Sequence, residues 1–329
     1  MTTARSSGLP RMDMVLDWLP NVQFAGPCWA LAHGLYREAG IDLALVPWEE
    51  DGRGIIEKTC ARTVPAIGSA EDNLVISAAA RGEANLSALA AMFLTTPLVL
   101  MSRPEAPIAS IDDLRGKRVA IHSDGLHILQ GLFRLHGISA NEVKVTEVVN
   151  DLTNLTSGRF DAVQGYAVCE PLEHAARGLR PKTLKMRHKA LHPYAQVMFA
   201  PSDALAVVPE LYRAALDVTF AGWQAAMADP AGAAAAIRAV GAPMTDPALE
   251  AVALELMADL VRGTGADGAR GLGRIDPARW AANIAAYATG GLVPESTSPN
   301  CGLRTDFWID TPEAGRDDAD PVAQAGAGA

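Results

Sequence analysis

Acidic, amide and aromatic side chains gather where the first strand of the chain is predicted to end. Trp18 closes a short apolar run over residues 14–18, and Asp17 and Asn21 flank it. An aromatic face at such a position can stack on a planar heteroaromatic ring, a contact worth about 0.5 to 1.5 kcal/mol beyond buried area. Asp17 and Asn21 can hydrogen-bond ring nitrogens. The alternatives are core packing for Trp18 and turn or helix-cap roles for its two neighbours.

A second group of polar residues follows the third predicted strand, over residues 66–68. Ser69 and Glu71 lie where this strand gives way to a helix predicted to start at Asp72. A carboxylate near a cleft can pair with the N–H groups of an amidine-like ring edge, which makes Glu71 a candidate ligand-binding residue. Ser69 is a candidate as well, but serine also accepts bonds from free N–H groups at helix starts, so N-capping is the alternative.

Ser123 and Asp124 occupy the loop after a predicted strand over residues 118–121. A helix that starts after such a loop attracts anions through its free N–H groups. Asp124 would repel an anion there. The pair therefore favours a neutral or cationic ligand.

Three more candidates come from the following part of the chain. Tyr166 and Glu170 follow a predicted strand over residues 160–164, and Tyr194 precedes another over residues 196–200. Glu170 can instead be a helix-start carboxylate that the helix dipole stabilises. Tyr194 can close the cleft or pack at a hinge.

The sequence shows no complete set of catalytic or metal-binding residues. It contains no nucleophile elbow, phosphate-binding loop or dinucleotide-binding glycine signature. None of the four cysteines forms a C-x-x-C pair, so we expect structural thiols rather than a zinc or iron–sulfur site. We therefore expect no metal and no cofactor.

The composition excludes some partners. Hydrophobic residues make up 49% of the chain and charged residues 20%, as in ordinary globular proteins. A net charge of -10 argues against nucleic acid, which requires a clustered basic surface. The most basic stretch, residues 177–189, is interpreted as a solvated connection, with a phosphate or anionic-ligand site as the alternative.

The N-terminal residues bear on the cellular location. Arg5 and Arg11 are not followed by the apolar run of a secretory signal peptide, and no apolar stretch is long enough for a transmembrane helix. A cytoplasmic location is therefore expected from the sequence as it stands. A misassigned start would instead allow an extracytoplasmic location.

Strand and helix patterns alternate along the first hundred residues. Strands are expected over residues 14–18, 41–47, 66–68, 86–93 and 98–102, and helices over residues 24–39, 52–62 and 72–81. This alternation predicts an α/β fold, a parallel-rich sheet with helices on both faces.

The same rhythm restarts after residue 104, which predicts a second lobe. We expect a flexible start over residues 1–11 and a disordered tail over residues 311–329. Between them, residues 12–103 and 196–310 would form one lobe and residues 104–195 the other. Two lobes joined by two crossovers enclose a cleft, which is where such folds bind ligands.

Several segments together resemble a known family. These are LDWLPN at residues 16–21, LYREAGIDL at 35–43, IDDLRGKRVAI at 111–121, and GRFDA at 158–162 followed by Tyr166 and Glu170-Pro171. In order and spacing they are similar to the thiamine-pyrimidine synthase and aminopyrimidine-binding family of periplasmic-binding-type proteins. The resemblance covers roughly residues 12–225 and implies a type II periplasmic-binding-protein-like fold.

The resemblance implies two kinds of function. One is the solute-binding component of an ABC-type uptake system, which holds a small pyrimidine-like ligand; Glu170 would then contact the ligand's amino group. The other is a thiamine-pyrimidine synthase that uses pyridoxal phosphate, its own histidine and iron. The synthase has a lysine and histidine where this chain has Ser69 to Asn73, and a cysteine cluster where it has residues 192–199. We therefore favour a binding protein over the enzyme.

Overall fold

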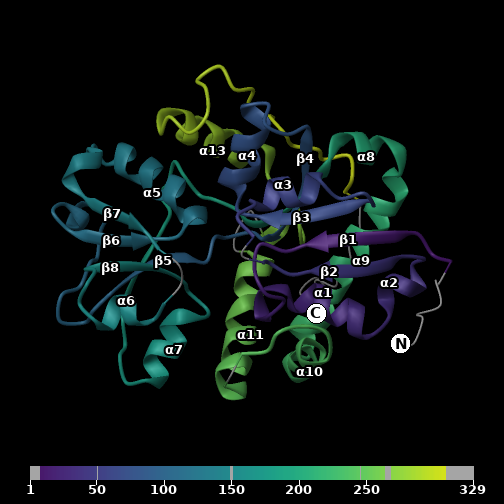
Figure 1. Cartoon of the computed structure of the whole chain (residues 1–329), viewed down its shortest axis with the longest axis horizontal. Helices are drawn as coiled ribbons and strands as arrows, with labels where there is room; N and C mark the ends of the chain where they lie inside the picture. The colour runs from purple at the N-terminus through teal and green to yellow at the C-terminus, as the bar shows by residue number, and fades with distance from the viewer. Residues whose placement is uncertain (1–7, 50, 149–150, 245, 264–267, 309–329) are drawn as a thin grey trace, which may run out of the picture.

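The computed structural model describes residues 8–49, 51–148, 151–244, 246–263 and 268–308. Its strands form two five-stranded sheets, which lie in separate lobes with helices packed around them (Figure 1). The two-lobed α/β fold expected from the alternating pattern is confirmed. The expectations for the first seven residues and for the tail over residues 311–329 lie outside the described residues, whereas Arg11 already belongs to a strand.

The first lobe is built on a sheet with the strand order β2-β1-β3-β10-β4. Its strands are β1 (Arg11–Val15), β2 (Asp42–Val46), β3 (Ala66–Ala70), β4 (Leu86–Phe93) and β10 (Ala195–Pro201). β1 pairs in parallel with β2 and β3, whereas β10 runs antiparallel between β3 and β4. β3 and β4 are buried throughout, as apolar strands covered on both faces should be.

The second lobe is built on a sheet with the order β7-β6-β8-β5-β9. Its strands are β5 (Leu98–Ser102), β6 (Arg118–Ile121), β7 (Lys144–Glu147), β8 (Ala162–Tyr166) and β9 (Lys182–Lys185). β6 pairs in parallel with β7 and β8, and β5 runs antiparallel between β8 and β9.

Two sequence-based expectations about this sheet were wrong. β5 was assigned to the first lobe, but it pairs with β8 and β9, so the first crossover comes before Leu98. A short apolar run has the same pattern in either sheet, and only tertiary pairing decides between them. The basic stretch over residues 177–189 contains β9, where a connection was expected; its lysines are exposed at the sheet edge, where charge discourages further strand pairing.

The helices follow the predicted pattern with different bounds. The expected helix over residues 24–39 is divided, because Gly34 adopts a left-handed φ of 77° between α1 and α2. In the first lobe the helices are η1 (Val22–Phe24), α1 (Ala25–Ala32), α2 (Leu35–Glu38), α3 (Ile55–Cys60), α4 (Asp72–Ala80), α8 (Ser202–Val207), α9 (Pro209–Ala228), α10 (Pro230–Val240), α11 (Pro247–Arg262) and α13 (Pro277–Thr289). In the second lobe they are η2 (Asp112–Leu114), α5 (Ser123–Leu135), η3 (Ala140–Glu142), α6 (Thr153–Thr156) and α7 (Glu170–Ala176).

Helix α13 braces the two segments that cross between the lobes. Its Arg279 donates to the carbonyl of Leu94 at 2.7 Å in the first crossover. It also donates to the carbonyls of His192 at 2.7 Å and Pro193 at 2.8 Å in the second crossover. The guanidinium lies 3.7 Å from the ring centre of Tyr194. One side chain therefore binds both crossover segments.

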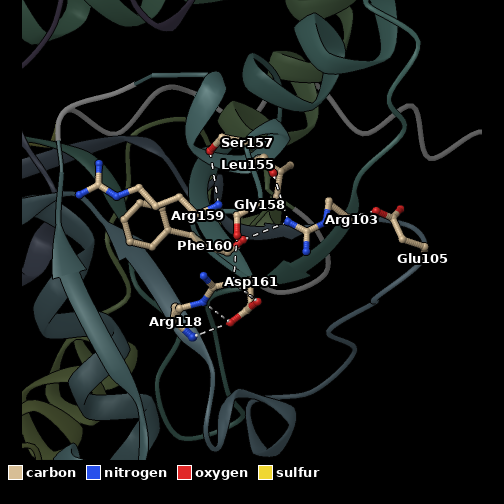
Figure 2. Close-up of polar contacts among 9 residues, drawn as sticks. All are labelled: Arg103, Glu105, Arg118, Leu155, Ser157, Gly158, Arg159, Phe160 and Asp161. Atoms are coloured by element: carbon tan, nitrogen blue, oxygen red, sulfur yellow. Dashed lines mark hydrogen bonds and ion pairs between the residues drawn. The ribbon is translucent and has the colours of Figure 1, made fainter.

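Two arginines fix the turn that leads into β8. Figure 2 shows Arg103 donating to the carbonyls of Leu155 and Phe160, at 3.3 Å and 3.2 Å. Arg118 binds both carboxylate oxygens of Asp161, at 3.1 Å and 2.8 Å. The GRFDA segment that carried part of the resemblance thus sets the position of β8, which delivers side chains to the cleft.

The cysteines and the helices add two further observations. All four cysteines are free thiols; Cys28 and Cys169 are buried as expected, whereas Cys60 is exposed and Cys301 is half-buried. No helix in the described part of the chain has both the length and the apolar character needed to cross a membrane.

Candidate functional site

A small inner pocket of about 70 Å³ lies between the lobes. The first lobe contributes residues that follow β1 and β3, and the second contributes residues at the ends of β6 and β8. Such a position, beyond the carboxyl ends of parallel strands, is where open α/β folds bind ligands. The lining residues are Asp17, Trp18, Gln23, Glu71, His122, Asp124, Gln164, Gly165, Tyr166, Glu170 and Gln196.

Four carboxyl groups converge on this pocket. Asp17 and Glu71 come from the first lobe, and Asp124 and Glu170 from the second. Within the described residues, the lining includes no lysine or arginine. Carboxylates this close together repel one another in a low-dielectric site, so the pocket favours a ligand that brings N–H donors or positive charge.

Glu71 is the most unusual of the four. Its side chain is 1% exposed, and its Oε1 accepts a bond of 3.3 Å from the Tyr166 hydroxyl of the opposite lobe. Its Oε2 is buried without a hydrogen-bond partner among the described residues. Burial, followed by the charges of Asp124, Asp17 and Asp72, raises the pKa of Glu71 well above its ordinary value. A buried carboxyl oxygen without a partner costs free energy that a ligand donor would recover.

Gln196 links the two lobes through its amide. Its Nε2 donates to Asp17 at 3.1 Å and to the Tyr166 hydroxyl at 3.3 Å, while its Oε1 accepts from Ser69. It is the one non-glycine residue with a positive φ, 51°, in the described part of the chain. Such a conformation is uncommon outside glycine and is often kept at functional sites.

Asp17 titrates near neutrality. Burial raises its pKa to about 7, the Gln196 bond lowers it in part, and the charge of Asp124 raises it again. A carboxyl group in this range changes charge in response to a bound cation or donor. Ligand binding and proton release at Asp17 are therefore expected to be coupled.

The second lobe holds its acidic residues firmly. Asp124 accepts from Gln164 Nε2 at 2.9 Å, and its carbonyl accepts from Asn73 of the first lobe at 3.0 Å. Glu170 accepts from the backbone N–H of Tyr166 at 2.7 Å. Two hydrogen bonds therefore join the lobes directly across the cleft: one from Asn73 to the Asp124 carbonyl, and one from Tyr166 to Glu71.

A larger outer basin of about 710 Å³ adjoins the inner pocket. Trp18 and Trp48 form one wall, with ring centres 5.4 Å apart and planes inclined by 29°. Arg53 and Lys58 also line the basin, and both bind the carboxylate of Asp51. The two compartments share Asp17, Trp18, His122 and Asp124, so they are continuous.

The sequence-based candidates are distributed unevenly around the cleft. Six line the inner pocket, namely Asp17, Trp18, Glu71, Asp124, Tyr166 and Glu170. Ser123 is the first residue of α5 and lines only the outer basin.

Three candidates line neither compartment. Asn21 caps η1 by accepting from Gln23 N at 3.0 Å. Ser69 is buried within β3 and does not cap a helix. Tyr194 is buried at the hinge, where its backbone N–H donates to Asp72 at 3.0 Å.

Sequence reasoning missed His122, Gln164, Gln196 and Trp48. The first three lie next to or within predicted strands, where polar residues in apolar runs were a usable signal. Trp48 follows the second strand just as Trp18 follows the first. No local sequence pattern predicts the left-handed backbone conformation of Gln196.

No group of three histidine, cysteine or acidic side chains in the described residues is arranged to hold a metal ion. The buried thiol of Cys28 donates to the Pro20 carbonyl at 3.8 Å, and burial raises its pKa to about 12. A thiol in this state is a weak nucleophile.

Two α/β lobes, two crossovers and an interlobe cleft define the class of two-lobed periplasmic-binding-type proteins, and solved structures of that fold match the chain. Residues 21–233 match the family described as NMT1/THI5 like, and the protein belongs to that family. The predicted family resemblance and the type II fold are both confirmed.

A curated relative is the riboflavin-binding protein RibY of Chloroflexus aurantiacus, 25% identical over 232 residues. The match covers 68% of this chain and 64% of RibY, so this chain spans less than two thirds of that protein's length.

Solved structures with low sequence identity share the fold. The alkanesulfonate-binding protein SsuA from Xanthomonas axonopodis pv. citri, bound to MOPS, has a TM-score of 0.65 and 14% identity over 91% of this chain and 100% of that one. The ligand-binding component of an ABC-type import system from Staphylococcus aureus, with zinc bound, has a TM-score of 0.66 and 13% identity over 91% and 97%. These similarities establish the fold.

Proposed function

We propose that the protein is a solute-binding protein for a small planar heteroaromatic ligand that presents N–H donors, such as an aminopyrimidine. The observation that carries this proposal is the unpartnered Oε2 of Glu71, buried in an acidic pocket whose described lining contains no lysine or arginine. A carboxyl group with a raised pKa can accept from an exocyclic amine while it shares its proton with the neighbouring ring nitrogen. Aminopyrimidines present that pair of groups on one edge.

In the proposed binding mode, each lobe contributes contacts to the ligand. Trp18, after the first strand of the first lobe, stacks on the ring. Glu71 of the first lobe and Glu170 of the second accept from its amino group. A ligand that contacts both lobes is bound fully only when they close, which is the usual hinge motion of two-lobed binding proteins.

The charge of the pocket separates this ligand class from the anions of some relatives. The Xanthomonas relative is named for binding alkanesulfonates. A sulfonate in the inner pocket would face four carboxyl groups without a lining lysine or arginine among the described residues. RibY is named for riboflavin, a planar heteroaromatic, which is closer to the class that the pocket favours.

The proposed partner is the permease of an ABC-type uptake system, and a cytoplasmic relative of such proteins is the alternative. The uptake role is supported by the name of the Staphylococcus aureus neighbour, an ABC-type import component. Cell fractionation distinguishes the two, because uptake requires the protein outside the cytoplasmic membrane.

A pyrimidine synthase is the alternative activity that the resemblance implies. Its pyridoxal phosphate would require a lysine for the coloured aldimine, and the one lysine lining the described cleft, Lys58, is engaged by Asp51 at 2.8 Å in the outer basin. We expect no aldimine absorbance and no pyrimidine product after incubation with pyridoxal phosphate and iron. Either signal would overturn the binding-protein proposal.

The proposal is tested by native mass spectrometry of the purified protein and by calorimetric titration with hydroxymethylpyrimidine. Replacing Glu170 by Gln removes a charge-assisted hydrogen bond of about 1.5 to 3 kcal/mol, so affinity should fall roughly 10- to 150-fold. Trp18→Ala should also weaken binding through lost stacking. Glu83→Gln, at an exposed carboxylate outside the cleft, is the control and should bind like the parent.

Unchanged affinity in both cleft variants would exclude the proposed binding mode. No binding by the parent would exclude the aminopyrimidine class.

A further inference from the structure

The two compartments of the cleft differ in size and in chemistry. The inner pocket, of about 70 Å³, has room for little more than the edge of one ring, whereas the outer basin holds about 710 Å³. Sites that enclose small molecules typically measure roughly 300 to 1,000 Å³. The outer basin alone falls in that range, so a single-ring ligand in the inner pocket would leave most of the cleft unfilled.

The outer basin is lined to receive an apolar or aromatic group. Trp48, Ile55 and Leu74 come from the first lobe, and Val148 from the second. Asp51 engages both cations of the basin, Arg53 at 2.7 Å and Lys58 at 2.8 Å. Three carboxylates, Asp17, Asp124 and Glu147, also line the basin, so it does not favour an anion.

The tryptophan pair limits how a ring can lie in this basin. The ring centres of Trp18 and Trp48 are 5.4 Å apart. A ring inserted between them would need about twice the stacking distance, roughly 7 Å, which exceeds this spacing. A ring in the basin therefore lies against the exposed side of the pair and not between its members.

We propose that the outer basin is a second subsite of the same ligand, so that the natural ligand is an amino-heteroaromatic head joined to a second planar or apolar arm. This inference rests on the proposed function. The head occupies the acidic inner pocket beside Glu71, and the arm lies along Trp48. Continuity through Trp18 and Asp124, which line both compartments, allows one molecule to span them.

The test uses two probes that share one head. Hydroxymethylpyrimidine carries the aminopyrimidine alone, and thiamine carries the same aminopyrimidine linked to a second ring. Calorimetric titration of the parent should give thiamine at least about tenfold higher affinity. Trp48→Ala, which removes a side chain that lines the outer basin and not the inner pocket, should abolish this gain and leave hydroxymethylpyrimidine within about twofold of the parent.

Two further variants separate the compartments. Trp48→Phe keeps an aromatic wall and should retain most of the gain, which distinguishes lost stacking from misfolding. A gain that survives Trp48→Ala would come from the charge of the thiamine ring and would overturn the second subsite. Glu71→Leu alters only the inner pocket and should weaken both probes by a similar factor.

Each negative result has one meaning. Equal affinity of the two probes for the parent, or equal weakening of both by Trp48→Ala, would overturn the second subsite while the proposed function stands. Absence of binding by both probes would exclude the aminopyrimidine class of the proposed function and overturn the subsite with it.

Discussion

Glu71 and Asp72 are adjacent in sequence, and both carboxyl groups are buried, yet the structure uses them differently. Asp72 accepts from the Tyr287 hydroxyl at 2.6 Å, from Asn283 Nδ2 at 2.9 Å and from the backbone N–H of Tyr194 at 3.0 Å. Glu71 accepts one bond of 3.3 Å and leaves its second oxygen without a partner among the described residues. The satisfied carboxylate fastens the hinge to α13, and the unsatisfied one is available to a ligand.

The pKa shifts alone would not have separated these two residues. Burial raises the pKa of Asp72 to about 6, and the bond from Tyr287 is the largest effect that opposes it. Burial also raises the pKa of Glu71, but nearby carboxylates add to the rise. The difference that matters is the number of partners, because a buried polar group that lacks one requires an explanation.

The largest expected effect is on stability and falls on Asp72. Asp72→Ala removes the acceptor of three buried hydrogen bonds, so the free energy of unfolding should drop by roughly 3 to 5 kcal/mol. Glu71→Leu removes a buried carboxyl whose Oε2 lacks a partner and loses only the 3.3 Å bond from Tyr166, so stability should be unchanged or higher. Urea unfolding of both variants measures the contrast, and similar losses in the two would refute it.

The second largest effect is on ligand binding, and here the substitution of Glu71 matters more than that of Asp72. Glu71→Leu should weaken hydroxymethylpyrimidine by at least about tenfold, since a charge-assisted hydrogen bond is worth about 1.5 to 3 kcal/mol. Calorimetry of the folded variant measures this loss, with Glu83→Gln as the matched control. If Glu71→Leu bound like the parent, the open oxygen of Glu71 would have no role in recognition.

The contrast also shows what could be predicted from sequence. Strand-end reasoning placed Trp18, Glu71 and Tyr166 in the cleft, because residues beyond the carboxyl ends of parallel strands share one edge. The two-lobed architecture followed from the repeated strand–helix rhythm in the same way. These features are local or periodic, and a single sequence contains them.

The features that were missed depend on tertiary contacts. β5 has an apolar pattern that suits either sheet, and its pairing with β8 decides its lobe. For Tyr194 the sequence left cleft closure and hinge packing open; it lies at the hinge because Asp72 and Arg279, distant in sequence, hold it there. Gln196 reaches the site through a left-handed backbone that no neighbouring residue type signals.

A third, smaller effect concerns pH. The pKa of Asp17 is raised to about 7, so below that pH the group is protonated and a donor-rich ligand loses an anionic neighbour. Affinity should therefore rise with pH up to about 7, by at most tenfold per unit for a single proton. Asp17→Asn should flatten much of this rise, although Glu71 and Asp124 still face the site. Because the same ligand is titrated against both proteins, its own protonation cancels in the comparison.

The effect of Asp17 on the stability of the ligand-free protein should have the opposite sign: stability should fall as the pH rises, whereas affinity rises. A folded-state pKa above the unfolded value of 3.8 means that the folded protein binds more protons between that pH and about 7. The contribution of Asp17 to stability is therefore full below pH 3.8 and is lost progressively as the pH rises to about 7. Asp17→Asn should lack this loss, and urea unfolding at several pH values measures it. A variant with the same pH dependence as the parent would assign the effect to another group.

The smallest expected effect comes from Asn73, which follows Glu71 and Asp72 in the sequence. Its Nδ2 donates to the Asp124 carbonyl at 3.0 Å across the cleft, so Asn73→Ala removes a bond that exists only when the lobes are together. A net hydrogen bond of about 0.5 to 1.5 kcal/mol corresponds to a roughly 2- to 12-fold loss of affinity, as the closed state becomes less populated. Small-angle scattering should show a larger radius of gyration for the ligand-free variant. Asn85→Ala is the matched control, because Asn85 bonds to Asp203 within the first lobe at 2.9 Å. If Asn85→Ala weakened binding as much, or if Asn73→Ala left both affinity and radius unchanged, the bond from Asn73 would not contribute to closure. Among the adjacent residues Glu71, Asp72 and Asn73, ligand affinity would then depend on Glu71 alone.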